Sequence, residues 1–221
     1  MSQSSIRSLF LEGPAGRLEA VLNTGQANPA YAAVVAHPHP LYGGTMHNKV
    51  VYHVAKTLNA LGFPVLRFNF RGAGASQGEH DHGRGEVEDV RAALAWLAGE
   101  FHLPIVFAGF SFGAAVGLRA ACPDDGVRAL IALGLPLGAE SRQYEYEFLE
   151  SCTKPKLFVS GERDESAPHQ ALSELVAGLP GPHRLVSIAG ADHFFTGSLP
   201  AVQAAIKAWI EETLPGNRVA V

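Results

Sequence analysis

The chain has 221 residues, 47% of them hydrophobic, and a formal net charge of −4 at pH 7. Folding a chain of this length buries roughly 70% of the surface that the unfolded chain exposes, so one sizeable core can form. The lysines and arginines are scattered, which argues against a nucleic-acid partner. No stretch approaches the roughly 18 apolar residues of a membrane span, and the amino-terminal residues lack the apolar run of a secretory signal. We therefore expect a cytoplasmic protein without a membrane partner.

Short apolar runs bounded by turn residues predict buried strands along the whole chain. The expected strands lie, in chain order, at 17–23, 30–37, 64–70, 104–110, 127–135, 155–161 and 183–190. Between them, apolar residues at helical spacing predict helices at 46–61, 86–98, 112–121, 168–178 and 200–213. Strands that alternate with helices predict one α/β domain over residues 1–221, with a mostly parallel sheet covered by helices on both faces.

The helical periods also predict which side chains face the core. In the helix at 86–98, the expected inward residues are Val87, Val90, Leu94 and Leu97. The charged residues of the same helix are expected to face solvent: Glu86, Glu88, Asp89 and Arg91. In the last helix, the expected inward residues are Val202, Ile206, Trp209 and Ile210.

The chain contains two cysteines, Cys122 and Cys152. Two are too few for a disulfide framework in a chain of this length, and neither lies in a CxxC or paired Cys/His pattern that would indicate zinc. We expect both cysteines to be reduced.

Two segments match the pattern G-x-S-x-G, at 109–113 and 74–78. In parallel sheets the functional side chains follow the carboxyl ends of strands, and a nucleophilic serine needs a strand before it and a helix directly after it. Ser111 follows an apolar strand and precedes an apolar helix. Ser76 is followed by QGEHDHGRG, which cannot begin a packed helix, so we expect an ordinary loop residue there. The pattern predicts Ser111 as a nucleophile.

The glycine-rich run at 71–78 loosely resembles a dinucleotide-binding loop. It lacks the immediate helix whose amino terminus would hold a pyrophosphate, so no cofactor is expected.

A serine nucleophile needs a base, usually histidine, which is oriented by a carboxylate. His193 lies in a loop after the last strand and before the last helix, and is the predicted base; the alternatives are His169 and His183. Asp164, three residues past the end of the preceding strand, is the predicted acid. The competing carboxylates are Glu162, Glu165 and Asp192.

The segment HPHPLYGG, residues 37–44, follows the second expected strand. Backbone N–H groups at this place and directly after the nucleophile can bind the oxyanion of an acyl-transfer intermediate. Proline has no N–H, which leaves His39 or Leu41 as the donor in this segment. We favour His39, because the flanking prolines hold it in an extended form, and expect Phe112 to supply the second N–H.

A metal site is an alternative role for four histidines near this segment, namely His37, His39, His47 and His53. No carboxylate or cysteine accompanies them, so we expect no metal site. His80 and His82 are expected to be loop residues that face solvent or contact the rim of the core loop.

The ordered motifs HPHPLYGGTMHNKVV, LRFNFRGAGASQGEHDHGRGEVEDV, GFSFG, GERD and ADHFF resemble small bacterial α/β-hydrolases without a lid, which are related to dienelactone hydrolases and short-chain esterases. The resemblance extends over residues 30–212. It implies an α/β-hydrolase fold, a triad of Ser111, His193 and Asp164, and no cofactor. Dienelactone hydrolases themselves use a cysteine nucleophile, where this chain has Ser111.

The segment between Leu135 and Pro155, where a lid is usually inserted, has room for one short helix but not for a large cap domain. An apolar rim around the site is expected from Tyr42, Leu137, Tyr144, Phe148 and Phe194. A small, open, apolar site predicts a carboxylesterase that takes short to medium acyl esters. A thioesterase or small peptidase would share every motif, and a non-catalytic ligand-binding protein on this fold is a further alternative. The expected partner is a small-molecule ester, and a homodimer is left open.

Overall fold

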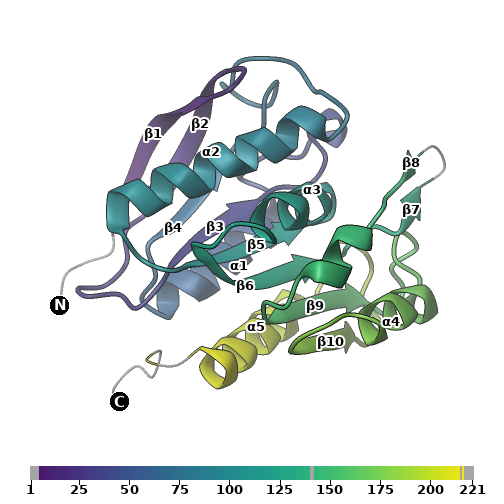
Figure 1. Ribbon diagram of the computed structural model, residues 1–221. Coiled ribbons are helices and arrows are strands. Elements are labelled where there is room, and N and C mark those ends of the chain that lie inside the picture. Colours follow the sequence, from purple (N-terminus) through teal and green to yellow (C-terminus); the bar gives the residue numbers. More distant parts are fainter. Residues whose placement is uncertain (1–4, 140–141, 215, 217–221) are drawn as a thin grey trace.

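The computed structural model describes residues 5–139, 142–214 and 216, and its centre is an eight-stranded sheet (Figure 1). The strand order is β1-β2-β4-β3-β5-β6-β9-β10. β1 pairs antiparallel with β2, and β2 with β4, whereas all other neighbours in the sheet are parallel. In chain order, the bounds of these strands are β1 Ile6–Gly13, β2 Gly16–Asn23, β3 Ala32–Ala36, β4 Val65–Phe68, β5 Ile105–Phe110, β6 Val127–Leu133, β9 Lys156–Gly161 and β10 His183–Ile188.

Within the described residues, five α-helices connect the strands and cover both faces of the sheet. They are α1 Lys49–Ala60, α2 Arg84–Phe101, α3 Phe112–Ala121, α4 His169–Ala177 and α5 Leu199–Thr213. The short elements are η1 Pro40–Tyr42, η2 Glu147–Ser151 and a small hairpin of β7 Gly138–Ala139 and β8 Arg142–Gln143. The α/β architecture with helices on both faces is confirmed. The sequence reasoning missed β1, which pairs with β2 along its full length.

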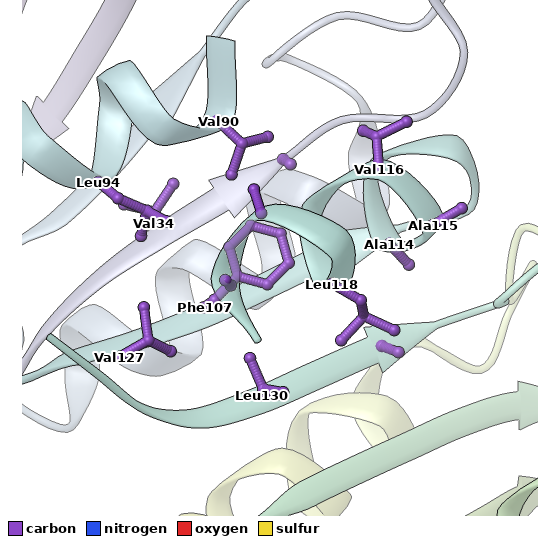
Figure 2. Packing of buried hydrophobic residues seen from close by; sticks show 14 of the residues in the cluster. Val34, Val90, Leu94, Phe107, Ala114, Ala115, Val116, Leu118, Val127 and Leu130 are labelled. Carbon is purple, nitrogen blue, oxygen red and sulfur yellow. The ribbon is translucent and has the colours of Figure 1, made fainter. Parts of the chain in front are cut away.

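Alternating side chains of the buried strands divide the core into two layers. Val34 of β3 belongs to the layer that α2, α3 and α4 cover, and its neighbour Val35 to the layer beneath α1 and α5. Phe107 of β5 is fully buried, and Figure 2 shows its ring among side chains from α2, α3 and the adjacent strands. The alternation arises because successive strand residues point to opposite faces, so a fully buried strand needs apolar residues at every position.

The prediction for α2 is only partly correct. Its four apolar residues are buried and Glu88 and Arg91 are exposed, as expected. Glu86 and Asp89, which we expected to face solvent, are both fully buried. A carboxylate that is removed from water needs polar partners, and each of these two finds them on the loop after β4. The helical period alone does not reveal such partners.

Asp89 is paired with Arg71, which lies three residues past the end of β4. Arg71 Nη2 lies 2.7 Å from Asp89 Oδ1, Nε donates to Oδ2 at 3.0 Å, and the Arg71 backbone N–H donates to the same oxygen at 3.0 Å. The hydrogen bonds to Asp89 raise the pKa of Arg71. This bidentate contact fixes the loop to α2, beside the carboxyl edge of the sheet.

His37, directly after β3, is a second buried polar group at this edge. Its Nδ1 donates to the carbonyl oxygen of Pro38 at 2.6 Å, and its Nε2 accepts the N–H of Phe70 at 3.0 Å. Burial lowers the pKa of His37 to about 4, so the ring is neutral at physiological pH. Because both ring nitrogens are engaged by the backbone, His37 joins the ends of β3 and β4 and has no lone pair left for a metal ion.

The expectation of two reduced cysteines is wrong, because Cys122 and Cys152 form a disulfide. Cys122 caps the end of α3 and Cys152 follows η2, and their Cα atoms are 5.8 Å apart, within the usual range for a disulfide. The count of cysteines in the sequence could not reveal that the two ends pack together. No helix in the described part of the chain is long and apolar enough to cross a membrane.

The buried Arg71–Asp89 pair predicts a large effect of Asp89→Ala on stability. Removal of the carboxylate leaves a guanidinium without its partner, and we expect a loss of about 3–5 kcal/mol in the free energy of unfolding. The matched control is Glu100→Gln, which breaks the exposed pair of Arg7 and Glu100 and should cost less than about 1 kcal/mol. Equilibrium urea denaturation at pH 7 measures both, and similar losses for the two variants would contradict the prediction.

The buried neutral ring of His37 predicts a dependence of stability on pH. An unfolded histidine takes up a proton near pH 6.5, whereas folded His37 does so only near pH 4. The contribution of His37 is therefore fully present above pH 6.5 and is lost as the pH falls toward 4, by about 3 kcal/mol in total. In NMR, the ring signal that disappears in His37→Gln should keep its neutral shift down to about pH 5. A titration midpoint at pH 6 or above would show that the ring is not held neutral.

Candidate active site

Ser111 lies at the sharp junction between β5 and α3. Its backbone angles, φ 54° and ψ −122°, are rarely adopted by residues with a side chain and cost about 1–3 kcal/mol. The surrounding backbone holds this conformation, since Ser111 N–H donates to the Leu133 carbonyl at 2.8 Å and Ala114 N–H to the Ser111 carbonyl at 2.9 Å. The turn brings the serine to the carboxyl edge of the sheet, as predicted from the strand and helix around it.

The two glycines of the motif are required by close backbone contacts. A Cβ atom at Gly113 would lie 2.4 Å from the carbonyl oxygen of His37, and one at Gly109 would lie 2.5 Å from the carbonyl oxygen of Gly113. Both distances are far below a van der Waals contact. The first turn of α3 can therefore pack against the end of β3 only without these side chains.

The second G-x-S-x-G match has a different role. Ser76 is buried, its hydroxyl donates to the Asn69 carbonyl at 2.7 Å, and it accepts the Glu19 N–H at 2.9 Å. The hydroxyl thus joins the loop to β2 and is not directed to the site, in agreement with its interpretation as a loop residue.

The structure brings Ser111, His193 and Asp164 into one hydrogen-bonded chain, although they lie far apart in the sequence. His193 Nε2 lies 2.9 Å from Ser111 Oγ, and His193 Nδ1 lies 2.8 Å from Asp164 Oδ2. A carboxylate oxygen can only accept, so Nδ1 carries the proton and Nε2 accepts from the serine hydroxyl. This is the tautomer in which an imidazole can take a proton from serine.

Asp164 is held in place by its own loop. Its side chain is fully buried, and Oδ1 accepts the N–H of Ser166 at 2.9 Å, which leaves Oδ2 for the histidine. The loop after β10 touches the end of β9 at Gly161, where a Cβ atom would lie 2.4 Å from the Ala191 carbonyl oxygen. This close approach fixes the distance between the acid and the base.

The competing residues have other contacts. Glu162 accepts the N–H of Gly190 at 2.7 Å, and Asp192 accepts the N–H of Thr196 at 2.8 Å, a hydrogen bond that lowers the pKa of Asp192. Glu165 is exposed in the same loop as Asp164. His169 begins α4 and His183 begins β10, and both are exposed.

The segment at 37–44 turns tightly after β3. His39 precedes η1 with extended backbone angles, φ −55° and ψ 122°, and its Nδ1 accepts the N–H of Leu41 at 3.2 Å. The sequence left two candidates for the backbone N–H donor, and the N–H of Leu41 is already bonded within the turn. Phe112 is the first residue of α3, where N–H groups have no acceptor inside the helix, and its ring lies 4.6 Å from that of His39. The roles of the His39 and Phe112 N–H groups as oxyanion donors stay a prediction.

A cavity of about 940 Å³ adjoins His39 and Phe112 and runs between the amino-terminal half of α2 and α3; we call it the α2–α3 cavity. Its lining consists of His39, His80, His82, Gly83, Arg84, Val87, Glu88, Arg91, Phe112, Ala115, Val116, Arg119, Tyr144, Glu145 and Tyr146. The sequence reasoning missed its charged side chains. The sequence could have indicated them, because Arg84, Glu88 and Arg91 are spaced by four and three residues and therefore lie on one face of α2.

The five predicted rim residues occupy different places. Tyr42 is exposed with its ring 5.0 Å from that of His39, and exposed Phe194 lies 5.2 Å from the ring of His193. Tyr144 lines the α2–α3 cavity. Leu137, together with Tyr144, lines a smaller cavity of about 330 Å³, and Phe148 packs against the core.

The loop histidines are unequal. His82 is exposed, whereas the side chain of His80 is only 7% exposed and its ring lies 4.6 Å from that of His39. His80 thus contacts the core loop, the second of the two expected roles. In the part of the chain that the structure describes, no three histidine, cysteine or acidic side chains are grouped so that they could hold a metal ion.

Comparison with known proteins agrees with this geometry. A family model described as an alpha/beta hydrolase domain matches residues 31–205. A protein of Rickettsia prowazekii without an assigned function is 36% identical over 197 residues, which cover 85% of this chain and 81% of that protein.

Two solved structures are also similar over almost the whole chain. A Xanthomonas campestris protein, described as an α/β serine hydrolase without a lid, is 33% identical, with a TM-score of 0.86 and 98% of both chains covered. A serine hydrolase homologue from Coxiella burnetii is 36% identical, with a TM-score of 0.82, and the match covers 94% of this chain and 98% of that one. A specific relationship to dienelactone hydrolases stays a prediction. The chain belongs to the α/β-hydrolase family, among the serine hydrolases that lack a lid.

Proposed function

We propose that this protein is a carboxylesterase in which Ser111 is the nucleophile, His193 the general base and Asp164 the residue that orients the base. The observation that carries the proposal is the hydrogen-bonded chain from Ser111 Oγ through the imidazole to the buried carboxylate. Each side chain has the partner that its role requires, and the two contacts to His193 lie within hydrogen-bonding distance without any movement.

The proposed reaction proceeds through an acyl-enzyme. Ser111 Oγ attacks the ester carbonyl while His193 Nε2 takes the hydroxyl proton, and Asp164 stabilises the imidazolium that forms. The N–H groups of His39 and Phe112 bind the oxyanion of the tetrahedral intermediate. The intermediate expels the alcohol, which leaves with the proton from His193. Water then attacks the acyl-serine with the same base, and the acid is released.

The acyl group is proposed to be short or medium in length. The α2–α3 cavity, at about 940 Å³, is large enough for a small organic group, and it begins at the residues that would bind the oxyanion. Thioesters and amides need the same triad, so a comparison of leaving groups on one acyl group decides among the esterase, thioesterase and peptidase activities.

The first test is the hydrolysis of p-nitrophenyl acetate and butyrate by the protein and by Ser111→Ala. The variant should lose about 10⁴-fold or more in kcat, because among the described residues only the Ser111 hydroxyl donates to His193 Nε2. A fluorophosphonate probe should label the wild-type protein and not the variant. Equal rates for the two proteins would rule out the serine-hydrolase mechanism and leave a ligand-binding role.

The second test separates Asp164 from the neighbouring carboxylate. Asp164→Asn should reduce kcat by about 10³–10⁴-fold, because an amide N–H opposite His193 Nδ1 favours the wrong tautomer. Asp192→Asn is the matched control, since Asp192 is next to His193 in sequence but accepts from Thr196, and an asparagine oxygen can still accept that bond. Ester hydrolysis by the control should stay close to that of the wild type. Similar losses in both variants would assign the effect to the loop and not to Asp164.

A further inference from the structure

The α2–α3 cavity has a lining that a simple apolar acyl chain does not require. Three arginines (Arg84, Arg91 and Arg119) and two glutamates (Glu88 and Glu145) line it, together with the polar rings of His80 and His82. The cationic side chains exceed the anionic ones by one in this lining, which also includes the predicted oxyanion residues His39 and Phe112. An arm of the substrate that enters this cavity therefore meets a surface suited to a single negative charge.

Arg119 is the cation best placed to meet such a charge. Arg84 lies 3.3 Å from Asp81, and Arg91 is paired with Glu88, whereas among the described residues no carboxylate lies within ion-pair distance of Arg119. Its guanidinium lies over the ring of Phe148, with Cζ 4.8 Å from the ring centroid, and Nη2 donates to the Glu145 carbonyl at 3.0 Å. These two contacts orient the guanidinium and use only part of its five N–H donors.

His80, on the loop before α2, also lines the cavity and lies against a buried carboxylate. Its Nδ1 lies 2.8 Å from Oε1 of Glu86, an ion-pair distance without the alignment of a hydrogen bond. Glu86 is itself held, since its two oxygens accept the N–H groups of Asp81 at 2.9 Å and Gly83 at 2.8 Å. With Nδ1 turned to Glu86, the Nε2 edge of the ring is the one left for the cavity.

The position of the cavity indicates which part of an ester would occupy it. The leaving oxygen must receive its proton from His193 Nε2, so the alcohol part lies toward the loop that carries His193. That loop is described throughout, and none of its residues lines the α2–α3 cavity, whereas His39 and Phe112 do. Ser111 itself is not among the lining residues either, so an acyl arm would extend from Ser111 past His39 and Phe112 to reach the cavity, and on this ground we place the cavity on the acyl side of the scissile bond.

From these observations we infer that the α2–α3 cavity binds an acyl arm that ends in a carboxylate, so that the substrates are monoesters of dicarboxylic acids. The inference rests on the proposed function and adds the substrate class. Hydrolysis by water would yield the alcohol and the free dicarboxylate. A guanidinium matches the geometry of a carboxylate, and the small excess of positive charge suits a monovalent group.

The helix sets the length of the arm. Arg119 lies seven residues after Phe112, which places it about 10 Å along the axis of α3. Arms of about six to eight carbons span such a distance. The adipate and suberate monoesters are therefore the suitable probes.

The experiment compares kcat/KM for mono-4-nitrophenyl suberate with that for 4-nitrophenyl octanoate, and the adipate monoester with the hexanoate. Hydrolysis by Ser111→Ala is subtracted as background. In the wild type, kcat/KM for the anionic ester should be about three to ten times that for the neutral ester, and this ratio should fall with added NaCl. Arg119→Gln should bring the ratio toward one, and Arg119→Lys should keep part of it because the charge remains.

Arg128→Gln is the matched control, because Arg128 is exposed on β6 and does not line the cavity. Its ratio should equal that of the wild type. A wild-type ratio of one or below, or a ratio that Arg119→Gln leaves unchanged, overturns the inference even when the neutral esters are hydrolysed through Ser111. If no ester is hydrolysed in a Ser111-dependent manner, the proposed function itself fails.

Discussion

The strained turn at Ser111 is the constraint on which the site depends. It exists because β5 ends against the start of α3, and because the neighbouring glycines allow helix and strand backbones to approach more closely than any side chain would permit. The hydrogen bond from Ser111 N–H to Leu133 O ties this turn to the adjacent strand. The position of Ser111 is thus set by the packing of the sheet and not by flexible loop contacts.

The loops around this turn are held by polar groups that are buried and paired. His37 bridges the ends of β3 and β4, Arg71 ties the next loop to Asp89, and Asp164 is fixed by the N–H of its own loop. A buried polar group that loses its partner costs free energy, so each of these hydrogen bonds tolerates little displacement of the loop that it holds. The same edge of the sheet that presents reactive groups is therefore also rigid, which is what a preorganised site requires.

The two sides of the site differ in chemical character. Exposed Phe194 lies beside His193 on the side where an alcohol would leave, whereas the α2–α3 cavity carries charged and polar side chains. A site without a lid has no covering domain to select its substrates. Under the proposed function, substrate selection falls to the cavity walls that α2 and α3 provide, where the guanidinium of Arg119 is held over the ring of Phe148.

The sequence by itself determined the order of strands and helices from β2 onward, apart from the short hairpin of β7 and β8, together with the serine at a strand-to-helix turn and the two loops that carry His193 and Asp164. These features follow from local periodicity and from the position of residues relative to strand ends. Only the tertiary structure decided that Glu86 and Asp89 are buried, that Cys122 meets Cys152, and that arginines line the α2–α3 cavity. Periodicity indicates which face of a helix is apolar, but the partner of a charged side chain comes from a distant part of the chain, and only packing brings the two together.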